Sequence, residues 1–225
     1  MRVKAIIQNH YPERLHNTVI MVDGLIKNGL KEEDITILFD YVPSPEVLRL
    51  KKTNIQVSNK NLPINWWHAV GSILDADYVA LLCDDLTLKS ESITQLTVLA
   101  DQNPDIGVLG YEGGKFADTD KPYTDTTSHK VEKSERADFL IRFYFARPKA
   151  LLRAINLYNL KHLDKKLKGH DDLLLSLSNL CMIAPTTDVT GWEELPEHGV
   201  AFSKRPEHYD ERNKLVFFIK HLYGD

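Results

Sequence analysis

Hydrophobic and polar positions form blocks along the first half of the chain that predict strands followed by helices. Apolar runs at residues 3–7, 35–39 and 79–83 predict buried strands. Between the first two runs, apolar residues at helical spacing over residues 13–28 predict an amphipathic helix, which Gly29 ends. Strands that alternate with helices at this spacing indicate βαβ units and a largely parallel sheet. The pattern therefore predicts an α/β fold.

The remaining elements of the first half follow the same pattern. They are a short helix at 45–51, a strand at 55–57, a helix at 66–74, a helix at 90–99 and a strand at 106–111. Crossovers between parallel strands are right-handed, so strand ends that follow one another meet at the same edge of the sheet. We therefore expect His10, Asp40 and Asp84 along one edge.

The second half of the chain has a different character. Residues 112–136 are polar and nearly without apolar periodicity, which predicts a surface loop. Gly113 and Gly114 are candidate hinges, and we expect this loop to order over a substrate as a lid. A strand that feeds a helix follows from residue 137 to about 156. The last helix carries an apolar stripe, formed by Leu215, Phe218, Ile219 and Leu222.

Composition narrows the class of protein. The chain has 225 residues, of which 43% are hydrophobic and 27% charged, as in an ordinary soluble globular protein. A net charge of −4 gives no electrostatic footprint for nucleic acid or an anionic membrane. No apolar run approaches the roughly 18 residues of a membrane span, and no signal peptide opens the chain, so we expect a cytoplasmic protein. Cys83 and Cys181 are expected to be reduced.

Two adjacent carboxylates follow the strand at 79–83 directly. Asp84 and Asp85 stand where open α/β sheets bind ligands, and carboxylate oxygens are the ligands that Mg²⁺ and Mn²⁺ prefer. Aspartate is also common after strands because it caps turns and helices. The sequence therefore predicts a divalent metal site that also contacts a diphosphate, with a structural turn as the alternative.

A second acidic group opens a helix after Gly169. His170, Asp171 and Asp172 precede the apolar run LLLSL. One aspartate suffices to cap a helix, so we expect Asp171 to cap it and Asp172 to point toward the metal site. Near the C-terminus, Arg205 and Arg212 flank the start of the last helix, and arginine is the residue that grips a diphosphate in bidentate fashion.

The order of these motifs resembles a known family. The segments IIQNHYPERL, ITILFD, NLPIN, LLCDDL and HDDLLLSL, with the terminal stretch ERNKLVFFIKHLYG, are similar in order to the exostosin-type glycosyltransferases of GT-A fold. More loosely, the first half resembles bacterial GT-A glycosyltransferases. The resemblance implies an α/β GT-A fold: a Rossmann-like nucleotide-binding half with a mostly parallel mixed sheet, merged with an acceptor-binding half. We expect one domain over 1–225, with 1–111 binding the nucleotide sugar and 112–225 the acceptor.

The resemblance also implies a nucleotide pocket and a metal site. The pocket residues that it implies are Gln8, Asn9, Arg14, Asp40, Asn61, Asn65 and Asp84. In the D-x-D motif the first acid is replaced by Cys83, which leaves Asp85 as the implied ligand of Mn²⁺ or Mg²⁺. Trp66 stands where the family pattern has an arginine, so the grip on the diphosphate is expected to pass to Arg205 or Arg212.

The implied activity is metal-dependent transfer of a sugar from a nucleotide sugar, with UDP as the expected nucleotide, to a glycan or another hydroxyl acceptor. Asp172, with Asp171 and Arg212, is the expected catalytic group near the reacting sugar carbon. Exostosin-type enzymes retain the anomeric configuration and many bacterial GT-A enzymes invert it, so both outcomes stay open.

Two other functions compete with this interpretation. A nucleotide-sugar-binding module that has lost turnover is the first, and Cys83 in the metal motif favours it. A sugar nucleotidyltransferase is the second, but such enzymes need a glycine-rich phosphate loop after the first strand. The corresponding segment, QNHYPER, contains no glycine.

Overall fold

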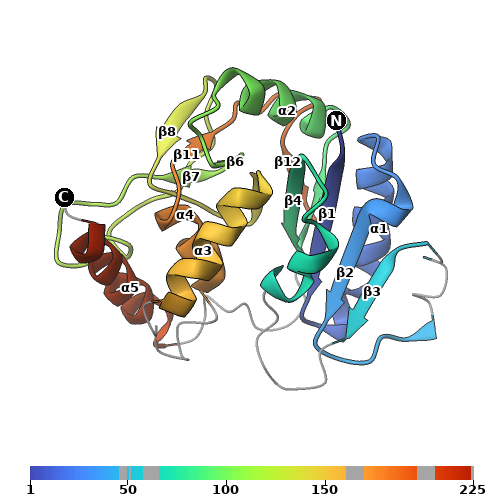
Figure 1. Ribbon diagram of the computed structural model, residues 1–225, viewed down its shortest axis with the longest axis horizontal. Helices are drawn as coiled ribbons and strands as arrows, with labels where there is room; N and C mark the ends of the chain where they lie inside the picture. The colour runs from blue at the N-terminus through green and yellow to red at the C-terminus, as the bar shows by residue number, and fades with distance from the viewer. Residues whose placement is uncertain (46–49, 51, 58–65, 161–169, 197–205, 224–225) are drawn as a thin grey trace.

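The computed structural model describes residues 1–45, 50, 52–57, 66–160, 170–196 and 206–223 (Figure 1). The predicted site residues Asn61, Asn65 and Arg205 lie outside these ranges. So does most of the expected helix at 45–51, of which only residues 45 and 50 are described.

An eight-stranded mixed sheet forms the centre of the molecule (Figure 1). Across the sheet its strands are β3 (Asn54–Val57), β2 (Ile35–Phe39), β1 (Val3–Asn9), β4 (Tyr78–Cys83), β10 (Phe143–Ala146), β6 (Val108–Gly110), β11 (Cys181–Ile183) and β8 (Glu135–Ala137). The first four are parallel to one another, β10 is antiparallel to both of its neighbours, and β8 is antiparallel to β11. The expected α/β fold with a mostly parallel mixed sheet is confirmed, and one sheet runs through both halves of the chain.

Helices and short ladders complete the fold. The helices are α1 (Leu15–Lys27), α2 (Ser92–Gln102), α3 (Pro148–Leu160), α4 (Asp171–Leu177) and α5 (His208–Tyr223), with 3₁₀ helices η1 (Pro12–Arg14), η2 (Glu32–Asp34) and η4 (Trp66–Ser72). Two small ladders pair β5 (Leu86–Leu88) with β12 (Trp192–Glu194) and β7 (Gly113–Gly114) with β9 (Phe139–Leu140). In Figure 1, α1 and α5 lie on opposite sides of the sheet.

The apolar strands bury side chains on both faces of the sheet. In β1, Ala5 and Ile7 join a core with α1 and α2, whereas Ile6 joins a second core with η4, α3, α4 and α5. Alternate side chains of a strand point to opposite faces, so a continuous apolar run is what a sheet covered on both sides requires. The continuous apolar runs seen in the sequence thus have a direct structural cause.

Several expected elements differ in detail. The helix expected from residue 13 begins as the 3₁₀ turn η1, with Pro12 at its start, and becomes α-helical only at Leu15. The helix expected at 66–74 is the 3₁₀ helix η4, because its aromatic residues and Gly71 favour a regular α-helix weakly. Gly29 has φ +88°, as expected of a residue that ends a helix. The apolar stripe expected on α5 included Phe218, but this side chain is 38% exposed. Val216 is buried in its place.

The segment 112–136 is tied down by specific contacts. Tyr123 packs with its ring centroid 5.5 Å from that of Phe139, and the side chain of Asn213 on α5 accepts hydrogen bonds from the backbone N–H groups of Tyr123 and Thr124, at 2.9 and 3.3 Å. A Cβ on Gly113 would lie 2.2 Å from the carbonyl oxygen of Phe139. This glycine permits a close backbone approach in the β7–β9 ladder, which differs from the hinge expected from the sequence.

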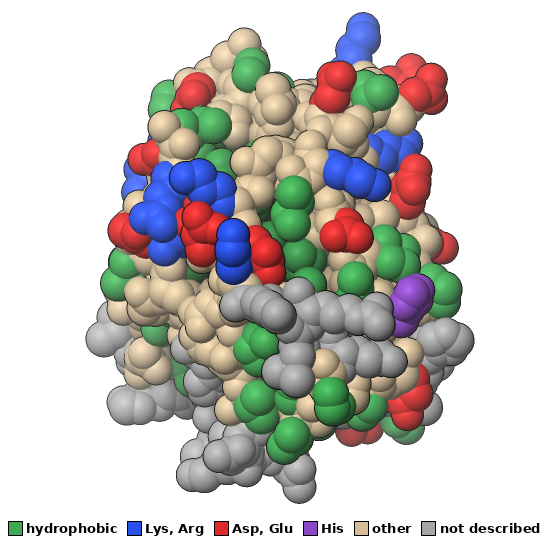
Figure 2. Space-filling view, turned by 90° about the vertical axis from the view of Figure 1, so that its right-hand side faces the viewer, with side chains coloured by type: hydrophobic (Ala, Val, Ile, Leu, Met, Phe, Trp, Pro, Cys, Tyr) green, Lys and Arg blue, Asp and Glu red, His purple; other side chains and the backbone are tan. Residues whose placement is uncertain are grey.

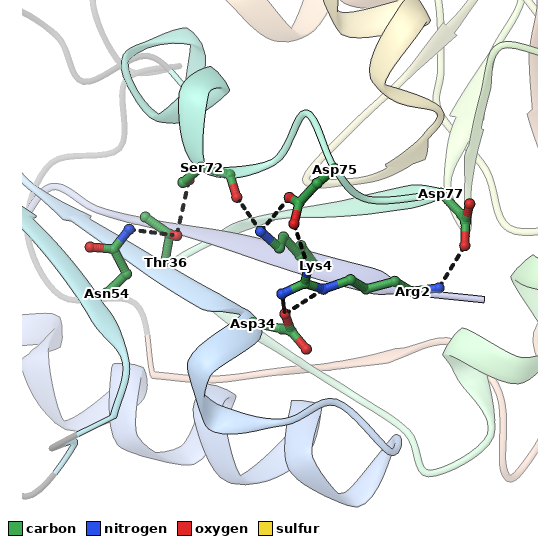
Figure 3. A network of polar contacts seen from close by, with 8 residues as sticks. All are labelled: Arg2, Lys4, Asp34, Thr36, Asn54, Ser72, Asp75 and Asp77. Carbon is green, nitrogen blue, oxygen red and sulfur yellow. Dashed lines mark hydrogen bonds and ion pairs between the residues drawn. The ribbon is translucent and has the colours of Figure 1, made fainter.

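A polar network connects the amino-terminal ends of the parallel strands (Figure 3). Arg2 donates to Asp34 at 2.7 Å and to Asp75, and Lys4 donates to Asp75 at 2.5 Å and to the carbonyl of Ser72 at 2.6 Å. These contacts join β1 to the segments before β2 and β4. They fix the strands at the end opposite to their carboxyl-terminal edge.

The surface carries charges of both signs. Figure 2 shows lysine and arginine side chains next to acidic ones on the face at the side of α1 and β3.

Both cysteines are free, as expected, with Cys83 half-buried and Cys181 buried. Among the helices of the described ranges, none is long and apolar enough to cross a membrane.

We predict that Asn213→Ala releases the segment around Tyr123 from α5. The buried Asn213 side chain also donates to Thr124 Oγ1 at 2.7 Å, so its loss leaves several polar groups unsatisfied and should cost about 1–3 kcal/mol of unfolding free energy. Trypsin cleavage after Lys115 should become faster. Phe217→Ala, at an exposed position of the same helix, serves as the control. Unchanged cleavage in Asn213→Ala would show that other contacts hold the segment.

Candidate functional site

The carboxyl-terminal ends of β1, β2 and β4 meet at one edge of the sheet. The backbone N–H of His10, which follows β1, donates to Asp84 Oδ2 at 2.9 Å. Nδ1 of the same histidine lies 3.7 Å from Asp40 Oδ2, after β2. Burial alone would lower the pKa of His10, but the hydrogen bond to Asp40 and the charges of Asp84, Asp40 and Asp171 together raise it. The expectation that His10, Asp40 and Asp84 share an edge is confirmed.

Asp84 is held inside the protein by several partners. Its side chain is 2% exposed, and Arg14 Nη1, itself on a side chain 5% exposed, donates to Asp84 Oδ1 at 2.6 Å. Asn17 Nδ2 donates to the backbone carbonyls of Asp84 and Pro196, both at 2.9 Å. A carboxylate with this burial and these donors anchors the turn after β4. Asp84 and Arg14 therefore pair with each other, and the nucleotide contact that the sequence predicts for them stays a prediction.

Asn9 is likewise committed to the interior. It is fully buried, its amide nitrogen donates to Thr18 Oγ1 at 2.7 Å, and its amide oxygen accepts from the Tyr41 hydroxyl at 2.7 Å. This places Asn9 behind the edge as a support for the loop after β1. Of the pocket residues predicted from the sequence, Gln8 and Asp40 remain half-buried at the edge itself.

Asp85 emerges beyond Asp84 on the other side of the turn. It is half-buried, and its backbone carbonyl accepts from Leu195 N at 2.8 Å, directly after the β5–β12 ladder. Burial and the nearby charges of Asp85 and Asp84, with those of Asp172 and Asp171, raise the pKa of Cys83. Four aspartates thus act electrostatically on one point at the end of β4.

The donor set at this point suits a metal that is completed by a substrate. Within the described residues, no three or more His, Cys, Asp or Glu side chains are arranged to hold a metal ion. Mg²⁺ in phosphate-binding sites is commonly held by one or two carboxylates with substrate phosphates and water. Asp85 fits the role of such a single carboxylate, and its metal binding remains a prediction.

The start of α4 differs from the sequence expectation. His170 is the N-cap residue, and no side chain makes a capping hydrogen bond there. Asp171 Oδ2 is buried with no hydrogen-bond partner among the described residues. Burial, together with the charge of Asp172, raises the pKa of Asp171 to about 7, although His10 opposes this shift. Asp171 is therefore the first residue of α4 and not its N-cap residue, and backbone hydrogen bonds at Asp171 and Asp172 partly offset the rise of its pKa.

Asp172 is committed to a buried ion pair. Arg212 Nη2 on α5 donates to both carboxylate oxygens of Asp172, at 2.9 and 2.7 Å. Burial alone would raise the pKa of Asp172, but the charge and hydrogen bonds of Arg212 lower it. Arg212 also donates to the Tyr123 hydroxyl at 2.8 Å and is only 6% exposed. The structure brings Asp172 and Arg212 together as a pair, which makes both less suited to the roles that the sequence predicts.

Arg142 also belongs to this site, and the sequence analysis missed it. It lies between β9 and β10, its Nη1 is 2.9 Å from Glu194 Oε1, and its carbonyl accepts from Cys83 N at 3.2 Å. The run FLIRFYF looks like one continuous strand, and the arginine that interrupts it was the available signal. Trp66, at the position where the family pattern has an arginine, is only 1% exposed and packs in the core. This position therefore presents no side chain to the site.

Comparisons with known proteins identify the fold. No family model matches the chain, and no curated protein matches it in sequence. The crystal structure of residues 1–349 of the S. aureus glycosyltransferase TarS in complex with UDP-GlcNAc is similar to it, with a TM-score of 0.66 and 15% identity over 97% of this chain and 66% of that one. A further TarS structure gives a TM-score of 0.64 and 13% identity, over 100% of this chain and 40% of that one.

A third TarS structure, of residues 1–349 in complex with UDP, gives a TM-score of 0.60 and 14% identity over 97% of this chain and 65% of that one. The chain thus spans two thirds or less of the length of these TarS chains. The similarity shows that this chain shares the α/β fold of TarS. It supports this class of fold, and it does not single out the exostosin-type family named from the motifs.

We predict that Arg14→Met destabilises the fold, because it leaves Asp84 buried without its cation. Breaking one side of a buried ion pair typically costs about 3–5 kcal/mol. Asp84→Asn should also be destabilising, and the double variant should lose less than the sum of the two single variants. Urea unfolding measures all three. Additive losses would mean that Arg14 and Asp84 stabilise the protein independently.

Proposed function

We propose that this protein is a metal-dependent glycosyltransferase that moves a sugar from a nucleotide sugar to a hydroxyl group of a glycan or another acceptor. The observation that carries the proposal is the Asp171 carboxyl group, whose Oδ2 is buried with no hydrogen-bond partner among the described residues and which lies within electrostatic reach of the acidic end of β4 and of His10. The similarity to TarS, which has been crystallised with UDP-GlcNAc and with UDP, supports it.

The donor in this proposal is a UDP-sugar. Its nucleotide lies along the edge formed by the ends of β1, β2 and β4, where Gln8 and Asp40 remain accessible. Ligands of open α/β sheets bind at this edge. Asp85 would hold a Mn²⁺ or Mg²⁺ ion, whose positive charge would stabilise the leaving diphosphate.

Asp171 is the general base in this proposal. Its carboxylate takes the proton of the acceptor hydroxyl, the acceptor oxygen forms a bond to the anomeric carbon, and the bond from that carbon to the diphosphate oxygen breaks. A carboxyl with a pKa near neutrality is a stronger base than an ordinary aspartate. A single displacement of this kind inverts the anomeric configuration. Asp172 and Arg212 hold the start of α4, and thereby Asp171, against α5.

We predict that Asp171→Asn lowers kcat for sugar transfer by roughly two to four orders of magnitude, the usual contribution of a positioned acid or base. Its stability at pH 8 should equal or exceed that of the parent protein. The folded pKa of about 7 lies above the ordinary value of 3.8, so ionisation costs stability as the pH rises between them, and asparagine avoids this cost.

Asp172→Asn is the matched variant, since it leaves Arg212 buried without a full counter-charge and should lower stability. Transfer assays and urea unfolding of both variants separate the two roles. A stable Asp172→Asn protein without turnover, beside an active Asp171→Asn protein, would assign the base to Asp172.

The pH dependence of kcat/KM provides a third prediction. Only the ionised Asp171 accepts a proton, so the rate should fall as the pH decreases through about 7. In Asp171→Asn the residual rate should lose this step. A parent profile that stays flat from pH 5 to 8 would exclude Asp171 as the base.

Removing the metal ligand should have a different signature. Asp85→Ala should abolish Mn²⁺-dependent turnover and leave the unfolding free energy nearly unchanged, because the half-buried Asp85 packs little of the core. The assay is a screen of UDP-sugar hydrolysis and transfer with and without Mn²⁺. Equal activity of Asp85→Ala and the parent at saturating Mn²⁺ would assign the metal to other ligands.

The second candidate function is a nucleotide-sugar-binding module without turnover. Cys83 at the position of the first acid of the metal motif favours it. Calorimetric titration of UDP in the presence of Mn²⁺, followed by the hydrolysis screen, separates the two functions. Binding without turnover of any nucleotide sugar would support the module.

A further inference from the structure

Three arginines lie beside the aspartates of the site, and they differ in how firmly they are held. Arg14 and Arg212 are 5% and 6% exposed, and each pairs with an aspartate of the site. The Arg142 side chain is 35% exposed, and its partner Glu194 is 70% exposed. An ion pair as exposed to water as this one contributes about 1 kcal/mol or less to stability. Arg142 can therefore exchange its partner at little cost.

The ion-pair partner of Arg142 lies next to the turn that carries Asp85. Glu194, its partner, stands opposite Leu86 in the β12–β5 ladder, and the next residue, Leu195, donates its N–H to the Asp85 carbonyl. Burial alone would lower the pKa of Arg142, but the hydrogen bond to Glu194 and the charge of Asp85 raise it. The guanidinium is therefore within electrostatic reach of the predicted metal ligand.

Arg142 also has an unusual backbone conformation. Its φ is 63°, and no other non-glycine residue in the described part of the chain has a positive φ. Such a conformation costs of order 1–3 kcal/mol and persists where the surroundings enforce it, commonly at binding sites. Here the hydrogen bond from Cys83 N to the Arg142 carbonyl, at 3.2 Å, helps to hold it, and the guanidinium lies 5.2 Å from the centroid of the Trp192 ring. The side chain is thus placed in advance of any ligand.

We propose that Arg142 grips the diphosphate of the donor nucleotide by exchanging Glu194 for it. This inference rests on the proposed function and assigns to Arg142 the role that the sequence predicts for Arg205 or Arg212. A guanidinium binds phosphate oxygens in bidentate fashion, and such contacts are stronger than an exposed carboxylate pair. Glu194 occupies the guanidinium until the nucleotide arrives.

The test compares two variants that break the same ion pair from opposite sides. Arg142→Met should raise the Kd for UDP, measured by calorimetry with Mn²⁺, by about 10- to 100-fold, since it removes a charged contact to the diphosphate. Glu194→Gln should bind UDP as tightly as the parent or more tightly, because a competing carboxylate is gone. Uridine, which has no phosphate, should bind Arg142→Met and the parent equally in an NMR titration.

Arg136→Met is the matched control. Arg136 is an exposed arginine on the edge strand β8, and its Nη2 lies 2.6 Å from Asp105 Oδ2, so its loss breaks a similar pair far along the sheet from β4. UDP affinity should not change in this variant. If Arg142→Met fails to fold, Arg142→Asn replaces it, because asparagine tolerates a positive φ.

The outcomes separate this inference from the proposed function. A parent protein that does not bind UDP would overturn the proposed function itself. If the parent binds UDP and Arg142→Met binds it equally well, Arg142 does not contact the diphosphate. Equal losses of UDP affinity in Arg142→Met and Glu194→Gln would make the pair a structural brace, and would likewise overturn the inference.

Discussion

The buried pair of Arg14 and Asp84 holds the candidate site together. Asp84 follows β4 and accepts from the guanidinium of Arg14, which ends the loop after β1, and from the backbone N–H of His10 in the same loop. Asn17 on α1 ties the Asp84 carbonyl to Pro196. Two charges that are almost fully removed from water must satisfy each other, so the two loops are fixed relative to one another. The accessible acids of the edge are displayed from this fixed point.

In each of the two acidic pairs of the site, one aspartate is held by an arginine. Asp84 pairs with Arg14 and Asp172 pairs with Arg212, and both arginine side chains are buried. A residue held by two charge-assisted hydrogen bonds fixes the backbone of the residue beside it. Burial, together with the charge of the neighbouring Asp172, raises the pKa of Asp171 to about 7, which suits acid–base chemistry near neutral pH.

Helix α5 connects the second half of the chain to this arrangement. Arg212 contacts Asp172 on α4 and Tyr123 in the segment after β7, and Asn213 holds the backbone of that segment. Three stretches that are far apart in sequence are thereby joined next to the acid at the start of α4. A change in any one of them is therefore expected to move the others, because a buried polar group that loses its partner is costly.

The sequence by itself determined the strand and helix order and the edge at which the site lies, because apolar runs and the residues that end them are local signals. The continuous apolar runs of β1, β2 and β4 required a sheet covered on both faces, and His10, Asp40 and Asp84 had to follow their ends. Only the tertiary structure decided which acid of each pair is buried against an arginine. Asp171 and Asp172 have the same chemistry and adjacent positions, and their difference comes from Arg212, forty residues away in the chain. Likewise Arg142 looks like part of a strand until the fold pairs it with Glu194, within electrostatic reach of Asp85, since long-range contacts leave no local pattern.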